Sequence, residues 1–110
     1  EGLWRQEMTD KTAWVETSGS ALLLFALGVA LERGLLAGEA RQALARGLAG
    51  LREYIQTDGS VRQTCVGCLC PGQGSQADYV ARPYTSDDPH SFGPIVLALS
   101  QGLACGLEDR

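Results

Sequence analysis

The longest apolar stretch of the chain runs from Ser18 to about Leu36 and meets its first charges only at Glu32 and Arg33. Before these charges nearly every position is apolar or small, so no polar stripe recurs with the period of a helix. This pattern is typical of a helix buried on all sides, because a surface helix carries one polar face. We therefore expect residues 18–36 to form a helix with neighbours all round it.

Polar residues mark both ends of this expected helix. Thr17 and Ser18 carry hydroxyl groups suited to an N-cap, and Glu16 places a carboxylate near the positive end of the helix dipole. The dipole is sufficient to explain Glu16, which we interpret as structural. Gly34 and Gly38 bracket the expected end of the helix.

The next segment, residues 39–55, has a single apolar stripe. Leu44, Leu48, Leu51 and Ile55 follow one another at spacings of four, three and four, and the charged residues fall elsewhere. This spacing predicts an amphipathic helix with one wet face. Because short connections favour antiparallel neighbours, residues 18–55 are expected to form a hairpin of one inner and one outer helix.

A long loop and a third helix complete the chain. Residues 58–90 are expected to be loop with a short strand at Val61–Cys65. Residues 91–106 return to the buried-helix pattern, with Pro94 expected in the first turn. The three helices make about one and a half hairpins. We therefore expect an all-α fold that is a partial helical toroid, because inner helices that are apolar on every face are covered only inside a larger ring or against another chain.

Charge and length exclude two classes of partner. The 110-residue chain has a net charge of -4 and no stripe of Lys and Arg, so no nucleic-acid partner is expected. The apolar run Ala21–Leu31 is shorter than the about 20 residues that span a bilayer. No charged segment of a signal peptide precedes it, so no membrane partner is expected either. Because the chain starts at Glu1, we interpret it as a processed product or a piece of a longer protein.

Several segments together resemble one enzyme family. The segments are GLWRQEMTD, WVETSGSALLLFALGVALERGLL, GLAGLREYIQTDGSV, CVG and YVARPYTSDDPHSFGPIVLAL. In this order and spacing they resemble the closing part of the unsaturated glycuronyl hydrolases of glycoside hydrolase family 105 and the related family 88. The combination of G-L-W-x-Q, E-T-S-x-S-A and H-S-F-G-P carries the resemblance, which implies an (α/α)6 barrel.

The resemblance also implies an activity. These enzymes act on the 4,5-unsaturated uronic acid at the non-reducing end of oligosaccharides left by polysaccharide lyases. A catalytic Asp protonates the double bond and helps water to add across it, which is general acid/base catalysis by one carboxyl group. The motif of that Asp lies upstream of this chain, so we assign no catalytic residue. Residues 1–110 are expected to be the C-terminal segment of such a barrel, without a complete catalytic domain and inactive alone.

The Asp residues that are present have structural interpretations. Asp58 precedes Gly59 and is expected in a turn, and Asp87 and Asp88 are expected in a polar loop. Asp10 lies in the Trp-bearing loop near the start of the chain, where it is expected to be solvated.

Candidate substrate-binding residues follow from the geometry of a toroid. The loops that lead into the inner helices converge on one end, where free backbone N–H groups and positive dipole ends favour a sugar carboxylate. Trp4 and Gln6 precede the first inner helix and His90 precedes the second. Trp offers a platform for a sugar ring, and Gln and His can hydrogen-bond hydroxyl groups. The structural alternative is that Trp4 and Trp14 plug the junction and that His90 is a satisfied cap. No cofactor and no metal ion are expected.

The cysteines leave three alternatives. Cys65, Cys68 and Cys70 form C-x-x-C-x-C, and Cys105 is distant. Four thiolates suit zinc, but the spacing lacks the second pair of a zinc ribbon or finger. We expect structural thiols first, disulfides next and a metal site last. The chain does not report its compartment, and we favour the cytoplasm.

Two hypotheses from different classes follow. The first is a segment of an unsaturated glycuronyl hydrolase that covers its inner helices by self-association into a homo-oligomer. The second is a freestanding helical interaction module, self-associating or clipped by a metal ion, without catalysis. The first hypothesis also implies an oligosaccharide as the substrate of the whole enzyme.

Overall fold

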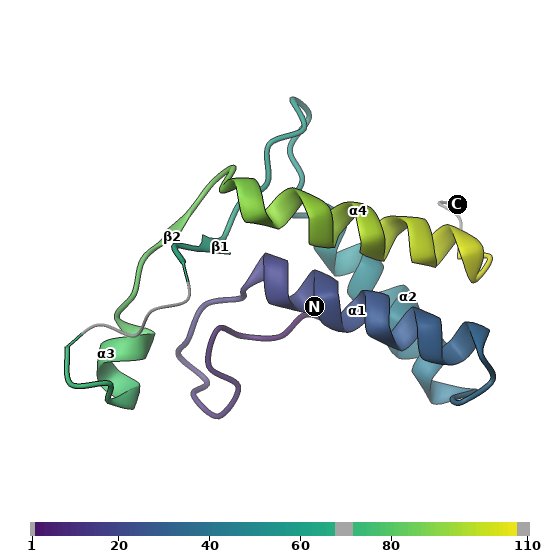
Figure 1. Cartoon of the computed structure of the whole chain (residues 1–110), viewed down its shortest axis with the longest axis horizontal. Coiled ribbons are helices and arrows are strands. Elements are labelled where there is room, and N and C mark those ends of the chain that lie inside the picture. The colour runs from purple at the N-terminus through teal and green to yellow at the C-terminus, as the bar shows by residue number, and fades with distance from the viewer. Residues whose placement is uncertain (1, 68–71, 108–110) are drawn as a thin grey trace.

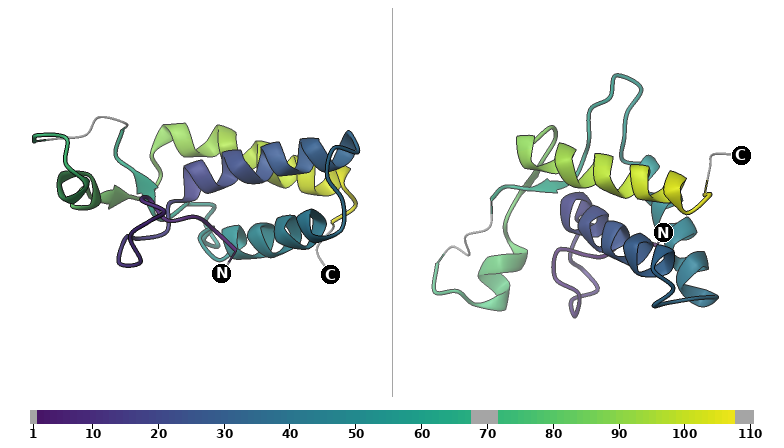
Figure 2. Two further views of the ribbon diagram at one scale, coloured as in Figure 1. Left: turned by 90° about the horizontal axis from the view of Figure 1, so that it is seen from below. Right: turned by 45° about the vertical axis from the view of Figure 1, so that its right-hand side comes forward.

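The computed structural model describes residues 2–67 and 72–107. Within them, three long helices form the body of the protein (Figure 1). Helices α1 (Thr17–Glu32) and α4 (Pro89–Ala104) lie side by side and run in the same direction, and α2 (Glu39–Arg52) runs antiparallel to them. The views of Figure 2 agree on this order. This arrangement matches the predicted order of an inner helix, an outer helix and a second inner helix. The other elements are the short helix α3 (Gln76–Val80) and the antiparallel strands β1 (Thr64–Cys65) and β2 (Tyr84–Thr85).

The first helix begins one residue earlier than expected, and its cap is Glu16. The Glu16 carboxylate accepts hydrogen bonds from the backbone N–H groups of Ser18 and Gly19. Our assignment of Thr17 or Ser18 as the N-cap is therefore wrong. Thr17 is instead fully buried, and its hydroxyl contacts the hydroxyl of Thr64 at 3.1 Å.

The same helix ends at Glu32, four residues before the expected Leu36. Gly34 adopts a φ of 70°, which glycine tolerates without a steric penalty. The N–H of Gly34 donates to Leu31 O at 3.0 Å, and the N–H of Leu35 donates to Ala30 O at 2.9 Å. These two bonds make a Schellman motif, so Gly34 ends the helix as its position suggested.

The predicted stripe of the outer helix forms the centre of the core. Leu44, Leu48 and Leu51 are almost fully buried, together with Leu24 of α1. Ile55 lies beyond the end of α2 and forms an isolated antiparallel bridge with Val61. Burial of one such leucine contributes about 1.5–3 kcal/mol, so this stripe holds α2 against the two inner helices.

The last helix begins at Pro89, two residues before the expected start. Asp88 caps it by accepting the N–H of His90, and Pro89 suits the first helical position because its φ is already helical. Pro94 is therefore inside the helix and not in its first turn, contrary to our prediction. Pro94 has no N–H, so the carbonyl of His90 lacks its usual intrahelical partner.

The region expected to be loop contains more structure than predicted. The expected strand is present only at its end, as β1, which pairs with β2 across Thr64–Thr85 and Cys65–Tyr84. The helix α3 was not predicted. A capping box of Ser75 and Asp78 begins it.

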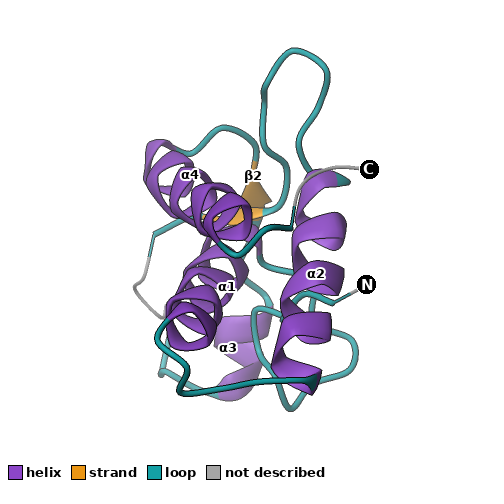
Figure 3. Cartoon of the chain, turned by 90° about the vertical axis from the view of Figure 1, so that its right-hand side faces the viewer, coloured by secondary structure: helices purple, strands orange, loops and turns teal. Residues whose placement is uncertain are grey.

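The α1–α4 pair carries exposed apolar side chains. Figure 3 looks roughly along α1 and α4 and shows α2 on one side of this pair. The exposed large apolar residues of the two helices are Leu22, Leu23, Phe92, Val96, Leu97 and Leu103. We call them the open face. Within this chain α1 is therefore not covered on every side, and the full cover that we expected for it requires a larger ring or another chain.

Candidate functional site

The first turns of α1 and α4 lie at the same end of the protein, as the toroid geometry predicted (Figure 1). The N-terminal loop reaches this end through an antiparallel bridge between Arg5 and Val15. The strands β1 and β2 lie beside it. Residues from segments far apart in the sequence are thus brought to one place.

Glu16 organises this end of the protein. Its Oε1 accepts from the N–H of Ser18 at 3.0 Å, from the Ser18 hydroxyl at 2.6 Å and from the N–H of Cys65 at 3.2 Å. Its Oε2 accepts from the N–H of Gly19 at 2.5 Å. Glu16 is 8% exposed, and the hydrogen bonds of its carboxylate to these donors offset the cost of burying its charge.

These contacts correct our expectation of free N–H groups at the inner-helix N-termini. The carboxylates of Glu16 and Asp88 already accept the first N–H groups of α1 and α4. The charges here are negative, so a sugar carboxylate is not favoured directly at either cap. Hydroxyl groups, which carry no charge, do not meet this repulsion.

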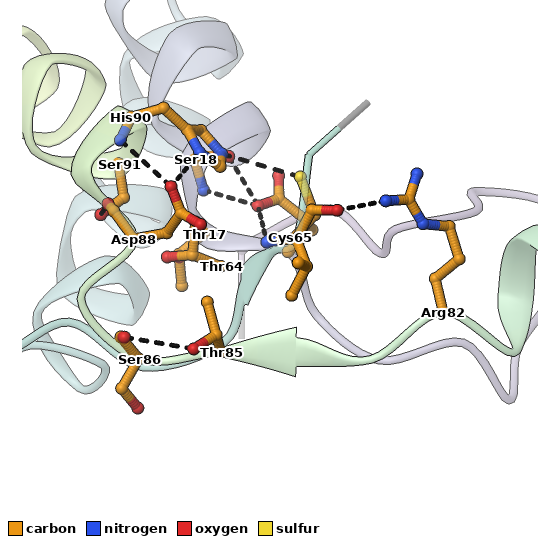
Figure 4. A network of polar contacts seen from close by, with 12 residues as sticks. Thr17, Ser18, Thr64, Cys65, Arg82, Thr85, Ser86, Asp88, His90 and Ser91 are labelled. Atoms are coloured by element: carbon orange, nitrogen blue, oxygen red, sulfur yellow. Dashed lines mark hydrogen bonds and ion pairs between the residues drawn. The ribbon is translucent and has the colours of Figure 1, made fainter. Parts of the chain in front are cut away.

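Next to Glu16, four polar side chains form a continuous cluster (Figure 4). The Nδ1 atom of His90 lies 2.6 Å from Oδ1 of Asp88. The Nε2 atom of His90 faces Oγ of Ser18 at 3.4 Å and Sγ of Cys65 at 3.8 Å. His90 thus joins the first turn of α4 to the first turn of α1 and to β1.

A pocket of about 250 Å³ lies beside this cluster. Its lining includes Trp4, Gln6, Glu16, Cys65 and Tyr79. The Nε2 of Gln6 donates to Tyr79 O at 2.8 Å, whereas its Oε1 is buried and has no hydrogen-bond partner among the described residues. A donor that reached Oε1 would remove the cost of this unsatisfied acceptor.

Two of the three predicted binding residues share this pocket. Trp4 and Gln6 line it, and His90 lies next to it through its contact with Cys65. The structural alternative holds for Trp14, whose indole N–H donates to Arg82 O at 3.3 Å and whose ring meets Tyr84 edge to face. The roles of Trp4, Gln6 and His90 in binding a sugar stay predictions.

Three residues of the site were not singled out from the sequence as binding residues. Glu16 and Asp88 were given structural interpretations, and Tyr79 was placed in a loop. A local signal existed for Tyr79, because the Ser75-x-x-Asp78 spacing is that of a capping box. The contacts of Glu16 with Cys65 had no local signal, since 49 residues separate the two.

Four carboxyl groups have a displaced pKa, and in each case hydrogen bonds lower it. The chief cause each time is the side-chain hydroxyl of a nearby Ser or Thr, which stabilises the charged form. The four are Glu7, Asp10, Asp58 and Asp78. A general acid near neutral pH needs a raised pKa, so none of these four groups suits that role.

The positions of two cysteines exclude a zinc site built from all four. Cys65 contacts Glu16 at the start of α1, whereas Sγ of Cys105 donates to Gly28 O near its end. From Glu16 to Gly28 the helix rises by about 18 Å along its axis. Cys65 and Cys105 therefore share neither a zinc ion nor a disulfide. Cys68 and Cys70 lie outside the described residues. Among the described residues no group of three His, Cys, Asp or Glu side chains is placed to hold a metal ion.

None of the helices in the described part of the chain is long and apolar enough to cross a bilayer.

Comparison with known sequences identifies one family. The model of Glycosyl Hydrolase Family 88 matches residues 1–104. Protein Atu3128 of Agrobacterium fabrum is 32% identical over 93% of this chain, and so is the 24.9 kDa protein in the picA locus of Rhizobium radiobacter. The match covers 52% of each relative, so the chain spans about half the length of these proteins.

Solved structures give the same result for the fold. A family 105 glycoside hydrolase of C. acetobutylicum is 25% identical and superimposes on 93% of this chain with a TM-score of 0.78, covering 32% of that enzyme. Possible family 105 members from Salmonella enterica and Klebsiella pneumoniae are 22% and 21% identical, with TM-scores of 0.84 and 0.85. Each match covers 94% of this chain and 26% of the larger protein. The predicted fold, a partial all-α toroid, is confirmed.

Proposed function

The chain belongs to Glycosyl Hydrolase Family 88, and from this premise we propose that it is the C-terminal segment of a glycosidase acting on oligosaccharides that end in an unsaturated uronic acid. The enzyme adds water across the 4,5 double bond of that sugar. The catalytic Asp belongs to the part of the barrel that precedes residue 1. This segment supplies one wall of the substrate cleft.

The observation that supports this role is the pocket at the N-termini of the inner helices. Trp4 offers an apolar surface to a sugar ring, and Gln6 offers a buried acceptor that lacks a donor. Sugar hydroxyl groups are donors of the required kind. An exposed His90 side chain beside the pocket can reach a further hydroxyl group.

The charged side chains near the pocket indicate which groups of the oligosaccharide this segment contacts. Glu16 and Arg5 line the pocket and Asp88 lies beside His90, so two carboxylates and one guanidinium group lie near the site. Repulsion from these carboxylates disfavours a uronate carboxylate directly beside Glu16 and Asp88. We assign neutral hydroxyl groups of the oligosaccharide to the part of this pocket beside Glu16, and the uronate carboxylate to a position away from the two caps.

The activity is tested by following the ultraviolet absorbance of an unsaturated uronic-acid disaccharide. The isolated chain is expected to leave the absorbance unchanged, because it lacks the general acid. Turnover by the purified chain would overturn the assignment of the catalytic Asp to a preceding part of the protein.

We further propose that the isolated chain forms a homo-oligomer through its open face. Exposed leucine, valine and phenylalanine side chains on two adjacent helices favour association, because their burial removes apolar surface from water. Light scattering distinguishes this self-associating barrel segment from the alternative, which is a freestanding helical interaction module. A stable monomer would favour the module, and a chelator-insensitive oligomer without turnover would favour the barrel segment.

A further inference from the structure

We propose that Cys65 is a modification site for soft electrophiles, with His90 as its general base and Asp88 as the residue that positions the imidazole. The proposal rests on the geometry of these side chains and is independent of the carbohydrate function.

The protons at His90 follow from its two neighbours. The carboxylate of Asp88 is only an acceptor, so the Nδ1 atom at 2.6 Å must carry the proton of that hydrogen bond. In the neutral imidazole the lone pair is then on Nε2, which faces Cys65 Sγ at 3.8 Å. The carboxylate of Asp88 therefore orients the imidazole of His90 so that its lone pair faces the Cys65 thiol. A base oriented in this way by a third group is the arrangement that activates a nucleophile.

Ser18 is the competing neighbour of the imidazole. Its Oγ lies 3.4 Å from Nε2 of His90. The single hydroxyl hydrogen of Ser18 points to Glu16 Oε1 at 2.6 Å, however, so its Oγ faces His90 as an acceptor. The thiol group of Cys65 is the donor that lies within reach of Nε2. Once His90 is protonated, the same Ser18 oxygen stabilises the imidazolium by accepting from Nε2–H.

The carboxylate of Glu16 determines at which point of the reaction the Cys65 thiol proton is transferred to His90. Its Oε1 accepts from the N–H of Cys65 at 3.2 Å, so a carboxylate charge lies close to the thiol and opposes a standing thiolate. We therefore assign the transfer to the moment of attack. With iodoacetamide, the S–H bond breaks and its proton passes to Nε2 while the sulfur attacks the methylene carbon. A C–S bond forms, the C–I bond breaks, iodide leaves, and His90 returns its proton to water.

The site is accessible to a small reagent. Cys65 is half-buried and lines the 250 Å³ pocket, and the side chain of His90 is 41% exposed. Cys105 provides an internal control. It is also half-buried, but it lies near the C-terminal end of α1, and His90 is the single histidine of the chain. No imidazole of this chain can therefore assist Cys105.

The test is the rate of alkylation at pH 7 by a small excess of iodoacetamide. The full chain is first reduced, and each labelled cysteine is located by tandem mass spectrometry. We expect Cys65 to react roughly tenfold faster than Cys105. This is less than the about 10²–10⁴-fold that general-base assistance typically provides, because the Glu16 carboxylate disfavours the developing thiolate. His90→Gln should lower the Cys65 rate by about tenfold. Asp88→Asn keeps a good N-cap for α4 and should lower the rate severalfold, because it removes the carboxylate that holds Nδ1–H.

Two controls separate base assistance from exposure or folding. The rate at Cys105 should be the same in the parent and in both variants. Far-ultraviolet circular dichroism should also be unchanged, because His90 is exposed and both substitutions are near-isosteric. An equal Cys65 rate in the parent and in His90→Gln, with folding intact, would overturn the proposal. Rates at Cys65 and Cys105 that fall together would also overturn it, because they would indicate a general change in reactivity.

Discussion

Gly28 of α1 lies directly against Gln101 of α4, and a Cβ atom at position 28 would come within 2.4 Å of Gln101 Cγ. Leu44 of α2 is also in contact distance, at 3.4 Å from the same position. The close approach of the two parallel helices therefore depends on the missing side chain. This approach keeps their first turns, which carry the candidate site, at one end of the protein.

Gly28→Ala is expected to destabilise the protein by about 1 kcal/mol. Overpacking costs about 1–3 kcal/mol, and the better helix propensity of Ala returns up to about 1 kcal/mol. Urea denaturation monitored by circular dichroism measures the difference. The matched control is Gly93→Ala in α4, where a Cβ meets no atom within 4 Å. It should stay within about 0.5 kcal/mol of the parent, because the gain in propensity is offset by the restriction before Pro94. A stabilised Gly28→Ala variant would contradict the close helix contact.

Glu16→Ala should cost at least about 2 kcal/mol, because it leaves buried donors of Ser18, Gly19 and Cys65 without their acceptor. Glu16→Gln keeps one acceptor oxygen and should cost about half as much. Glu39→Ala, at an exposed position in the first turn of α2, is the control and should shift stability by less than about 0.5 kcal/mol. Equal unfolding midpoints for Glu16→Ala and Glu39→Ala would show that Glu16 does not organise this end.

The start of α3 should weaken at acidic pH. Hydrogen bonds from the Ser75 hydroxyl, then from backbone N–H groups, lower the pKa of Asp78. A lowered folded-state pKa means that the stabilisation is complete above the unfolded value of about 3.9 and is lost as the pH falls through the folded value. Ser75→Ala should raise the pKa of Asp78 toward its usual range, as followed by NMR of the carboxyl carbon.

Asp58 supplies the control for this titration. The Ser60 hydroxyl is the main cause of its lowered pKa, so Ser60→Ala should raise the pKa of Asp58 and leave that of Asp78 unchanged. A shift of Asp78 in Ser60→Ala, or none in Ser75→Ala, would refute the assignment of the capping box as the cause.

Introducing a charged side chain on the open face should dissociate the proposed oligomer. Val96 is 61% exposed on α4, so Val96→Lys should lower the molar mass in light scattering toward that of the monomer without loss of helix. Leu35→Lys changes a side chain that is 73% exposed in the loop after α1, and should leave the mass unchanged. An equal effect of both substitutions would place the contact elsewhere.

The helices were predictable because their signals are long and local. The stripe of Leu44, Leu48 and Leu51 repeats with the helical period, and it is buried as expected. The helix α3 has only five residues, too few to show a period, and only its capping box signalled it. The cap at Glu16 was missed for another reason. Ser and Thr are the commoner N-caps, whereas this carboxylate is fixed by its contact with Cys65, which only the fold brings near.

The site was predictable only in outline. The toroid pattern correctly brings Trp4, Gln6 and His90 to the same end of the protein. It could not show that the N–H groups at this end are already capped, since that depends on side-chain directions at Glu16 and Asp88. The hydrogen bond from Gln6 Nε2 to Tyr79 O and the imidazole contact of Cys65 likewise join segments far apart in the sequence.

The most direct test of the carbohydrate site is a fluorescence titration of a Trp14→Phe variant. The chain has two tryptophans, so this variant reports on Trp4 alone. We predict a saturable change in emission when an unsaturated uronic-acid disaccharide is added, and weaker binding when Gln6→Leu is introduced into the same variant. Emission from Trp4 that stays constant throughout the titration would contradict the assignment of this pocket to the sugar.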